Sequence, residues 1–128
     1  MGVFDALRVS ASGLHAERAR LDAIAQNIAN VETTRSAAGG PYRRRQVVLA
    51  GTESGVRVAG LQADPSPPCR VHNPSHPDAD AEGYVLMPNV DLPTEMADMI
   101  LAARAYEANA AALRTGREIV RQALSILA

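Results

Sequence analysis

The C-terminal stretch "TEMADMILAARAYEANAAALRTGREIVRQALSIL", residues 94–127, decides the fold, because its larger apolar residues recur every seven positions. That spacing places them on one stripe of an α-helix. Thr94 follows Pro93 and suits a helix N-cap, while Glu95 and Asp98 lie in the first turn, where the helix dipole favours acidic groups. We therefore predict one helix of about 50 Å whose stripe is Met99, Tyr106, Leu113, Val120 and Leu127, flanked by Met96, Ala103, Ala110 and Leu124.

The N-terminal segment repeats this pattern over residues 3–30. Leu7, Leu14, Leu21 and Ile28 are seven residues apart, which predicts a second helix of about 40 Å. A single amphipathic helix cannot bury its stripe, and isolated helices are marginally stable in water. We therefore expect the two terminal helices to pair with each other, with other chains, or with both.

The middle of the chain contains all eight prolines, so long helices are expected only at the two ends. Residues 42–49 and 55–61 are predicted to form a β-hairpin closed by the turn 50–54. The following residues, 62–83, are rich in Pro, Asp, Ala and His, which predicts an irregular loop before a short strand at 84–87.

These patterns predict a mainly α protein, in which two long terminal helices enclose a small β-hairpin and loop insert. The expected organisation is an N-terminal helix at 1–32, a small β/loop region at 33–93 and a C-terminal helix at 94–128.

Composition narrows the class of protein. The formal net charge is -1 and the sequence pI is about 6.3, so the overall charge does not favour nucleic acid or an acidic membrane as a partner. Cys69 is the only cysteine, which excludes an internal disulfide. No run approaches the roughly 18 apolar residues of a membrane span, and the charged N-terminal segment lacks the apolar core of a cleavable signal peptide.

The loop at residues 69–82, "CRVHNPSHPDADAE", gathers groups that bind metals elsewhere, including Cys69, His72 and His76. A zinc site, and with it a small metal-dependent hydrolase, is one alternative that this loop leaves open. However, Pro74 and Pro77 forbid a helix there, so the spacing of the two histidines does not put both rings on one face. The positions of Asp78, Asp80 and Glu82 do not match a calcium loop. We therefore favour a structural loop, with no metal or cofactor.

Two further groups of polar residues could have either a structural or a functional role. Arg43, Arg44 and Arg45 form the only dense basic cluster; on a strand they would alternate faces, which favours a solvated or subunit-pairing strand over a nucleic-acid site. A helical adaptor that binds nucleic acid through these arginines remains the alternative. On the first helix, His15 lies beside Leu14 as an interfacial polar residue, and Asn27 and Asn30 lie near its C-terminal turn.

Residues 10–48, "SASGLHAERARLDAIAQNIANVETTRSAAGGPYRRRQVV", resemble the N-terminal signature of flagellar rod, hook and axial proteins, in which Ser-Gly-Leu is followed by Asn-Ile-Ala-Asn. Three further segments resemble the proximal rod members of that family: "GGPYRRRQV", "NPSHPDADAEGYVLMPNVDLPTEMADMI" and "ARAYEANAAALRT". The chain departs from those relatives at His72 and Asn73, where an aromatic residue and an acid are usual, and at Cys69, where a larger residue is expected.

The resemblance implies a structural subunit of the bacterial flagellar basal body, without enzymatic activity. Such a subunit is exported by the flagellar type III system without a cleaved signal peptide and assembles into the periplasmic rod that carries torque. Its terminal helices pair as an antiparallel coiled coil. Its partners are other copies of itself, other rod proteins and the junction of the MS ring with the export gate. The resemblance implies no nucleic-acid partner, and no segment of the chain that spans a membrane.

We expect assembly to use the two heptad stripes. The residues of this predicted assembly seam are Leu7, Leu14, Leu21, Ile28, Met99, Tyr106, Leu113, Val120 and Leu127.

Overall fold

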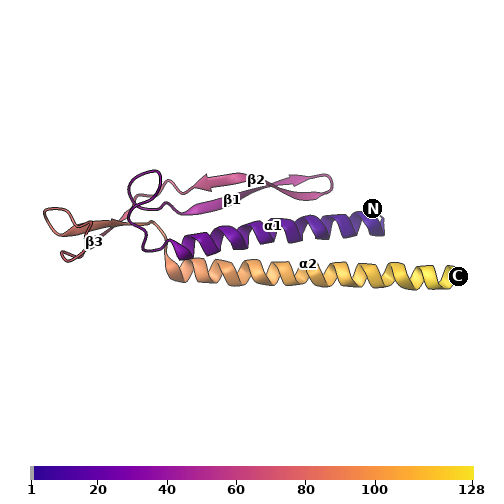
Figure 1. Ribbon diagram of the computed structural model, residues 1–128. Coiled ribbons are helices and arrows are strands. Elements are labelled where there is room, and N and C mark those ends of the chain that lie inside the picture. Colours follow the sequence, from indigo (N-terminus) through magenta and orange to yellow (C-terminus); the bar gives the residue numbers. More distant parts are fainter. Residues whose placement is uncertain (1) are drawn as a thin grey trace.

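The computed structural model, which describes residues 2–128, consists of two long helices and two small antiparallel sheets (Figure 1). Helix α1 spans Val3–Ala29 and helix α2 spans Leu92–Leu127, so about half of the residues are helical. Between the helices lie β1 (Arg45–Thr52), β2 (Gly55–Ala63), β3 (Cys69–His72) and β4 (Tyr84–Met87). Both predicted helices and the small β insert are confirmed.

Helix α1 ends at the asparagine that the sequence placed at its C-terminal turn. The backbone N–H of Asn30 and its side-chain Nδ2 both donate to the carbonyl oxygen of Gln26, at 3.1 and 2.8 Å. These bonds satisfy a carbonyl that would otherwise lack a partner at the end of the helix. At the other end, Asp5 accepts the backbone N–H of Gly2 at 3.1 Å.

Helix α2 begins earlier than predicted. Its N-cap is Asp91 rather than Thr94, and the Asp91 carboxylate accepts hydrogen bonds from the backbone N–H and the hydroxyl of Thr94. Pro93 lies in the first turn, where its missing N–H has no partner to lose. The assignment of Thr94 as N-cap was therefore wrong by three residues, because proline at this position opens a helix as readily as it precedes one.

The hairpin is confirmed with shifted boundaries. β1 pairs antiparallel with β2 from Arg45 opposite Ala63 to Thr52 opposite Gly55, with a β-bulge between Val48 and Leu49. The turn contains two residues only, and Gly55 follows it with φ of +130°, a backbone conformation that glycine adopts readily. Because β1 starts at Arg45, the two preceding arginines lie outside the strand.

The prediction of an irregular loop over residues 62–83 was wrong in two places. Residues 62 and 63 continue β2, and β3 forms a ladder with β4 from Cys69 opposite Met87 to His72 opposite Tyr84. The strand at 84–87 was predicted correctly. Its partner β3 was not predicted, because β3 pairs with a segment that is distant in the chain and its own sequence has no periodicity typical of a strand.

The elements form layers along one axis (Figure 1). Helix α1 lies between the β1–β2 hairpin and α2, and the two helices run antiparallel, so the start of α1 and the end of α2 lie at one end of the molecule and the β3–β4 sheet projects from the other. Among the helices and strands of residues 2–128, α2 contacts α1 alone. Neither helix is long and apolar enough to cross a membrane.

The interior is small. Its buried apolar residues are Ala16, Ala23, Ile24, Val85 and Ala102. Hydrophobic stabilisation is roughly proportional to apolar area removed from water, at about 25 cal/mol per Å², so alanines contribute little of it. Many larger apolar side chains remain exposed instead, especially on α2. The fold therefore leaves much of its apolar surface available for contacts with other chains.

Candidate assembly surface

The predicted seam residues differ in exposure. Leu7, Leu14 and Leu21 are half-buried on α1, and Met99 and Leu113 are half-buried on α2. Ile28 and Val120 are also half-buried, whereas Tyr106 and Leu127 are exposed. The buried apolar residues of the two helices are instead Ala16, Ala23, Ile24 and Ala102, of which three are alanines.

Glycine permits close contact between α1 and α2 at two places. A Cβ atom on Gly13 would lie 2.7 Å from Nδ2 of Asn109, and one on Gly116 would meet the side chain of Leu7. Such distances are too short for ordinary packing. The glycine of the Ser-Gly-Leu signature therefore has a structural reason, since it lets α2 approach α1.

The serine before it holds the hairpin. Ser12 Oγ accepts the backbone N–H of Val56 at 3.1 Å and donates to the carbonyl oxygen of Val9 at 2.6 Å. A Cβ atom on Gly55 would collide with Ser12, so the hairpin turn sits directly on α1. The adjacent residues Ser12 and Gly13 thus contact the hairpin and α2, respectively.

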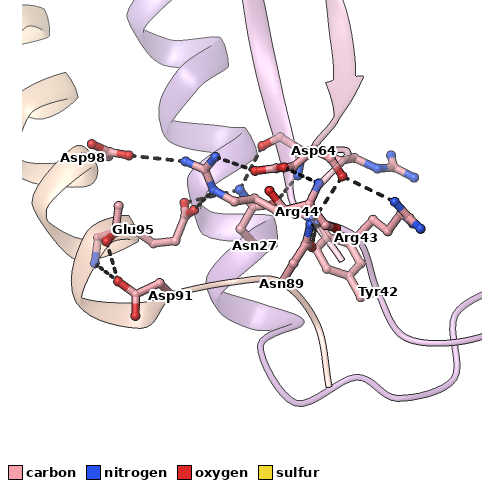
Figure 2. A network of polar contacts seen from close by, with 12 residues as sticks. Asn27, Tyr42, Arg43, Arg44, Asp64, Asn89, Asp91, Glu95 and Asp98 are labelled. Atoms are coloured by element: carbon pink, nitrogen blue, oxygen red, sulfur yellow. Dashed lines mark hydrogen bonds and ion pairs between the residues drawn. The ribbon is translucent and has the colours of Figure 1, made fainter. Parts of the chain in front are cut away.

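At the other end of α1, a polar node joins the insert to both helices (Figure 2). We use this name for Asn27, Tyr42, Arg44 and Glu95 with their hydrogen-bonding partners. Asn27 is 1% exposed; its Oδ1 accepts the Arg45 backbone N–H and the Tyr42 hydroxyl, both at 2.9 Å. Its Nδ2 donates to the Arg45 carbonyl at 2.9 Å and to Glu95 at 3.3 Å. Asn27 therefore binds the start of β1 as a strand would.

Arg44 lies at the centre of the node. Its guanidinium forms ion pairs with Glu95 and Asp98 of α2 and with Asp64, which follows β2 (Figure 2). Its backbone N–H donates to Asn89 Oδ1 at 2.8 Å. Burial alone would lower the pKa of Arg44, but hydrogen bonds and charge interactions with Glu95 and Asp64 raise it, so the residue stays charged.

This geometry corrects the interpretation of the arginine cluster. Arg44 is not on a strand, because β1 begins at Arg45. It is not solvated either, because its side chain is 17% exposed and binds three carboxylates. Glu95, which the sequence indicated only as a first-turn acid, is fully buried. All four node residues lie in segments that resemble the family, but nothing in those segments indicates that they contact one another. Their burial follows from contacts between distant segments, which composition does not reveal.

Tyr42 is half-buried beside the node. Removal of its hydroxyl from water raises the pKa of Tyr42; the charge of Arg45 opposes this effect and that of Glu95 adds to it. The phenol is therefore neutral and available to donate to Asn27.

The loop at 69–82 uses its polar residues internally. The Asp78 carboxylate accepts from Thr34 Oγ1 and Arg35 Nε, both at 2.5 Å, and these bonds lower the pKa of Asp78. Asp80 accepts the backbone N–H groups of Tyr84 and Glu82 at 2.9 Å, and they lower the pKa of Asp80. Asp78 thus connects the loop to the segment after α1, and Asp80 stabilises the turn before β4.

The histidines of this loop also have other partners. The His72 ring lies 4.9 Å from that of Tyr84, in an edge-to-face arrangement, and His76 Nδ1 accepts the backbone N–H of Asp78 at 3.0 Å. Over residues 2–128, no three His, Cys, Asp or Glu side chains are grouped as a metal site requires. The Cys69 thiol is exposed and unpaired with another cysteine. No contact in the loop supports the metal-dependent hydrolase.

His15, which the sequence analysis interpreted as an interfacial polar residue, is exposed on α1.

Exposed apolar residues gather on α2 and at the N-terminal end of α1. Ile100 and Leu101 are 61% and 63% exposed, and Phe4 is 67% exposed. Helix α2 extends past the first turn of α1 (Figure 1), and on this extension Ile126 and Leu127 are both 83% exposed. Between the ends of the helices, one groove of about 330 Å³ is lined by Phe4, Leu7, Arg117, Val120, Arg121 and Leu124. Such surfaces are typical of contacts between proteins.

Family comparisons match both ends of the chain. Residues 7–35 match a family described as "Flagella basal body rod protein". Residues 81–126 match a second, described as "Flagellar basal body rod FlgEFG protein C-terminal". The two matched segments include most of α1 and nearly all of α2.

Individual relatives extend the similarity to almost the whole chain. The flagellar basal-body rod protein FlgC of Borreliella burgdorferi is 42% identical, with 99% of each chain covered. FlgC of Yersinia enterocolitica is 40% identical over 98% of this chain and 96% of its own. FlgC of Bacillus subtilis is 37% identical over 98% and 99%. With this identity over nearly its full length, and with the signature residues of both helices in place, the chain belongs to the FlgC family of flagellar basal-body rod proteins.

Proposed function

We propose that this chain is a structural subunit of the proximal part of the flagellar basal-body rod. The observation that carries the proposal is its similarity to FlgC proteins over nearly the full length. The fold supports it, because a small interior and long helices with exposed apolar residues suit a subunit that completes its packing with neighbours.

In this proposal the chain leaves the cytoplasm unfolded through the flagellar type III system, without a cleaved signal peptide, and assembles in the periplasm. Its neighbours are further copies, other rod proteins and the junction between the MS ring and the export gate. The region from 33 to 93 forms a small insert on the outside of the terminal helices, which occupy 1–32 and 94–128.

The terminal helices then continue in the rod as an antiparallel coiled coil that contacts neighbouring subunits. The half-buried residues of the predicted seam, including Leu14 and Leu113, hold the pair together, while the more exposed Ile100 and Leu124 contact other chains. Torque passes through many such contacts, each modest on its own.

Substitution of the exposed surface tests this assignment. In a flagellated strain that carries the chain in place of its own copy, Ile100→Asp or Leu124→Asp should abolish rod assembly and swimming, because a buried, unpaired charge opposes association. The seam variants Leu14→Asp and Leu113→Asp should do the same. Basal bodies would be isolated and inspected by electron microscopy, and the level of each variant measured by immunoblotting.

Ala111→Asp is the matched control, since Ala111 is an exposed α2 residue close to the charged residues Arg104, Glu107 and Arg114 along the helix. It should leave swimming intact. Full motility of both Ile100→Asp and Leu124→Asp would show that these two exposed apolar residues of α2 have no role in assembly.

A further inference from the structure

The heptad stripes of α1 and α2 do not by themselves define one register. Both stripes repeat every seven residues, and three of the four buried apolar residues of the helices are alanines, Ala16, Ala23 and Ala102, the fourth being Ile24. A slip of one helix by seven residues would therefore bring equivalent apolar faces together again. In coiled coils, a single buried polar residue often selects one register among such alternatives.

The polar node is the buried polar contact between these helices. Glu95 of α2 is fully buried, and it accepts hydrogen bonds from Asn27 of α1 and from Arg44, just before β1. Asn27 is fixed in turn, because both ends of its amide bind the backbone of Arg45. Glu95, the acceptor on α2, is thus bound by Asn27 of α1 and by Arg44 of the insert.

A slip of α2 by seven residues would break these contacts together. Glu95 would leave Asn27 and Arg44, and Arg44 would lose two of its three carboxylates because Asp98 moves with the same helix. A buried charge without its partner is strongly unfavourable, whereas the apolar stripes lose little. The node therefore adds an energetic difference between registers that the stripes lack, beside the close contacts at Gly13 and Gly116.

We infer that Glu95, held by Asn27 and Arg44, is the positioning residue that sets the register of α2 against α1. The pair with Arg44 selects one register and adds little to the stability of the fold. It also places α2 relative to the hairpin, which α2 does not contact directly.

The test measures a distance within one chain and so does not depend on rod assembly. Spin labels are attached at Arg18→Cys and Gln122→Cys, two exposed positions on different helices, in a Cys69→Ser background. Double electron–electron resonance on the purified full-length chain should give one narrow distance distribution. When Arg44→Met and Glu95→Leu are added together to this labelled chain, the distance distribution should show a second peak. We expect that peak to be shifted by about 10 Å, the length of seven helical residues.

Removal of the exposed Arg104–Glu107 ion pair, by Arg104→Leu with Glu107→Leu, is the matched control and should keep the single peak. Circular dichroism establishes that each variant retains its helices. Glu95→Leu alone, which leaves Arg44 paired with Asp64 and Asp98, is the milder variant and should also produce the second peak.

A single unshifted peak in the folded variants would overturn the inference. So would a broad distribution in the unsubstituted chain, because its helices would then have no fixed register. Unfolding of both node variants would contradict it too, since it would assign the pair to stability instead.

Discussion

Gly13 shows how a single residue decides the approach of two helices. The residue is half-buried on α1, and any side chain there would meet Asn109 of α2, whose Nδ2 also donates to the carbonyl oxygen of Ala105 at 3.1 Å. Glycine in a helix is unfavourable by about 0.5–1 kcal/mol relative to alanine. Its presence at this point is explained by the space that α2 needs.

Gly13→Val should therefore destabilise the chain by about 1–3 kcal/mol, the usual range for overpacking a close contact. The measurement is the urea midpoint of the purified chain, followed by circular dichroism. Ala11→Val, at an exposed position on the same helix, controls for the β-branched side chain and should change stability by less than about 0.5 kcal/mol. Asn109→Ala should recover part of the loss; no recovery would mean that Asn109 is not the obstacle.

Also at the scale of residues, Asn27 and Ser12 explain why polar groups interrupt an otherwise apolar pattern. Asn27 binds the backbone of Arg45, and Ser12 binds that of Val56, so each of them holds one end of the hairpin on α1. Buried polar groups are tolerated when their hydrogen bonds are complete. Within residues 2–128, every buried side-chain nitrogen and oxygen has a partner.

At the scale of elements, the β3–β4 sheet and its loop are held by carboxylates rather than by a large apolar core. Asp78 ties the loop to the segment after α1 through Thr34 and Arg35, and Asp80 holds the turn that leads into β4. Val85 is the one β3–β4 residue that is almost fully buried. This region should therefore respond to acid more than the helices do.

The lowered pKa values of Asp78 and Asp80 give the direction of that response. In the unfolded chain these groups take up protons at about pH 4, whereas the folded carboxylates do so only at lower pH, so their stabilisation is complete above about pH 4 and is lost as the pH falls through the folded pKa values. A carboxyl-carbon NMR titration should give both midpoints below those of model peptides.

Arg35→Gln should raise the midpoint of Asp78 and leave that of Asp80 unchanged, because Arg35 contacts only the former. Equal shifts at both residues would contradict the separate roles assigned to the two carboxylates.

At the scale of the whole molecule, stability should fall from the polar node towards the chain ends. The node joins α1, α2 and the insert, whereas α2 extends past the first turn of α1 (Figure 1) and its last residues, Ile126 and Leu127, are both 83% exposed. Regions with few buried contacts open locally at low free energy.

Trypsin should therefore cleave the dilute chain at Arg121 before it cleaves at Arg44. The order of fragments would be read by mass spectrometry over a time course. Glu95→Leu, which loosens the node, should accelerate cleavage at Arg44 and leave the rate at Arg121 nearly unchanged. Equal rates at the two sites in the unsubstituted chain would show that the node confers no local protection.

The sequence by itself determined both helices, the hairpin and β4, because each depends on a local periodicity or a local turn. It also determined the family, through signature residues that are close together in the chain. Tertiary structure alone decided that β3 is a strand, that Glu95 is buried and that Arg44 is paired, since each depends on segments more than ten residues away. The same limit explains the seam: a heptad pattern shows which stripe is apolar, but the side chains that fit between two helices depend on how closely those helices approach.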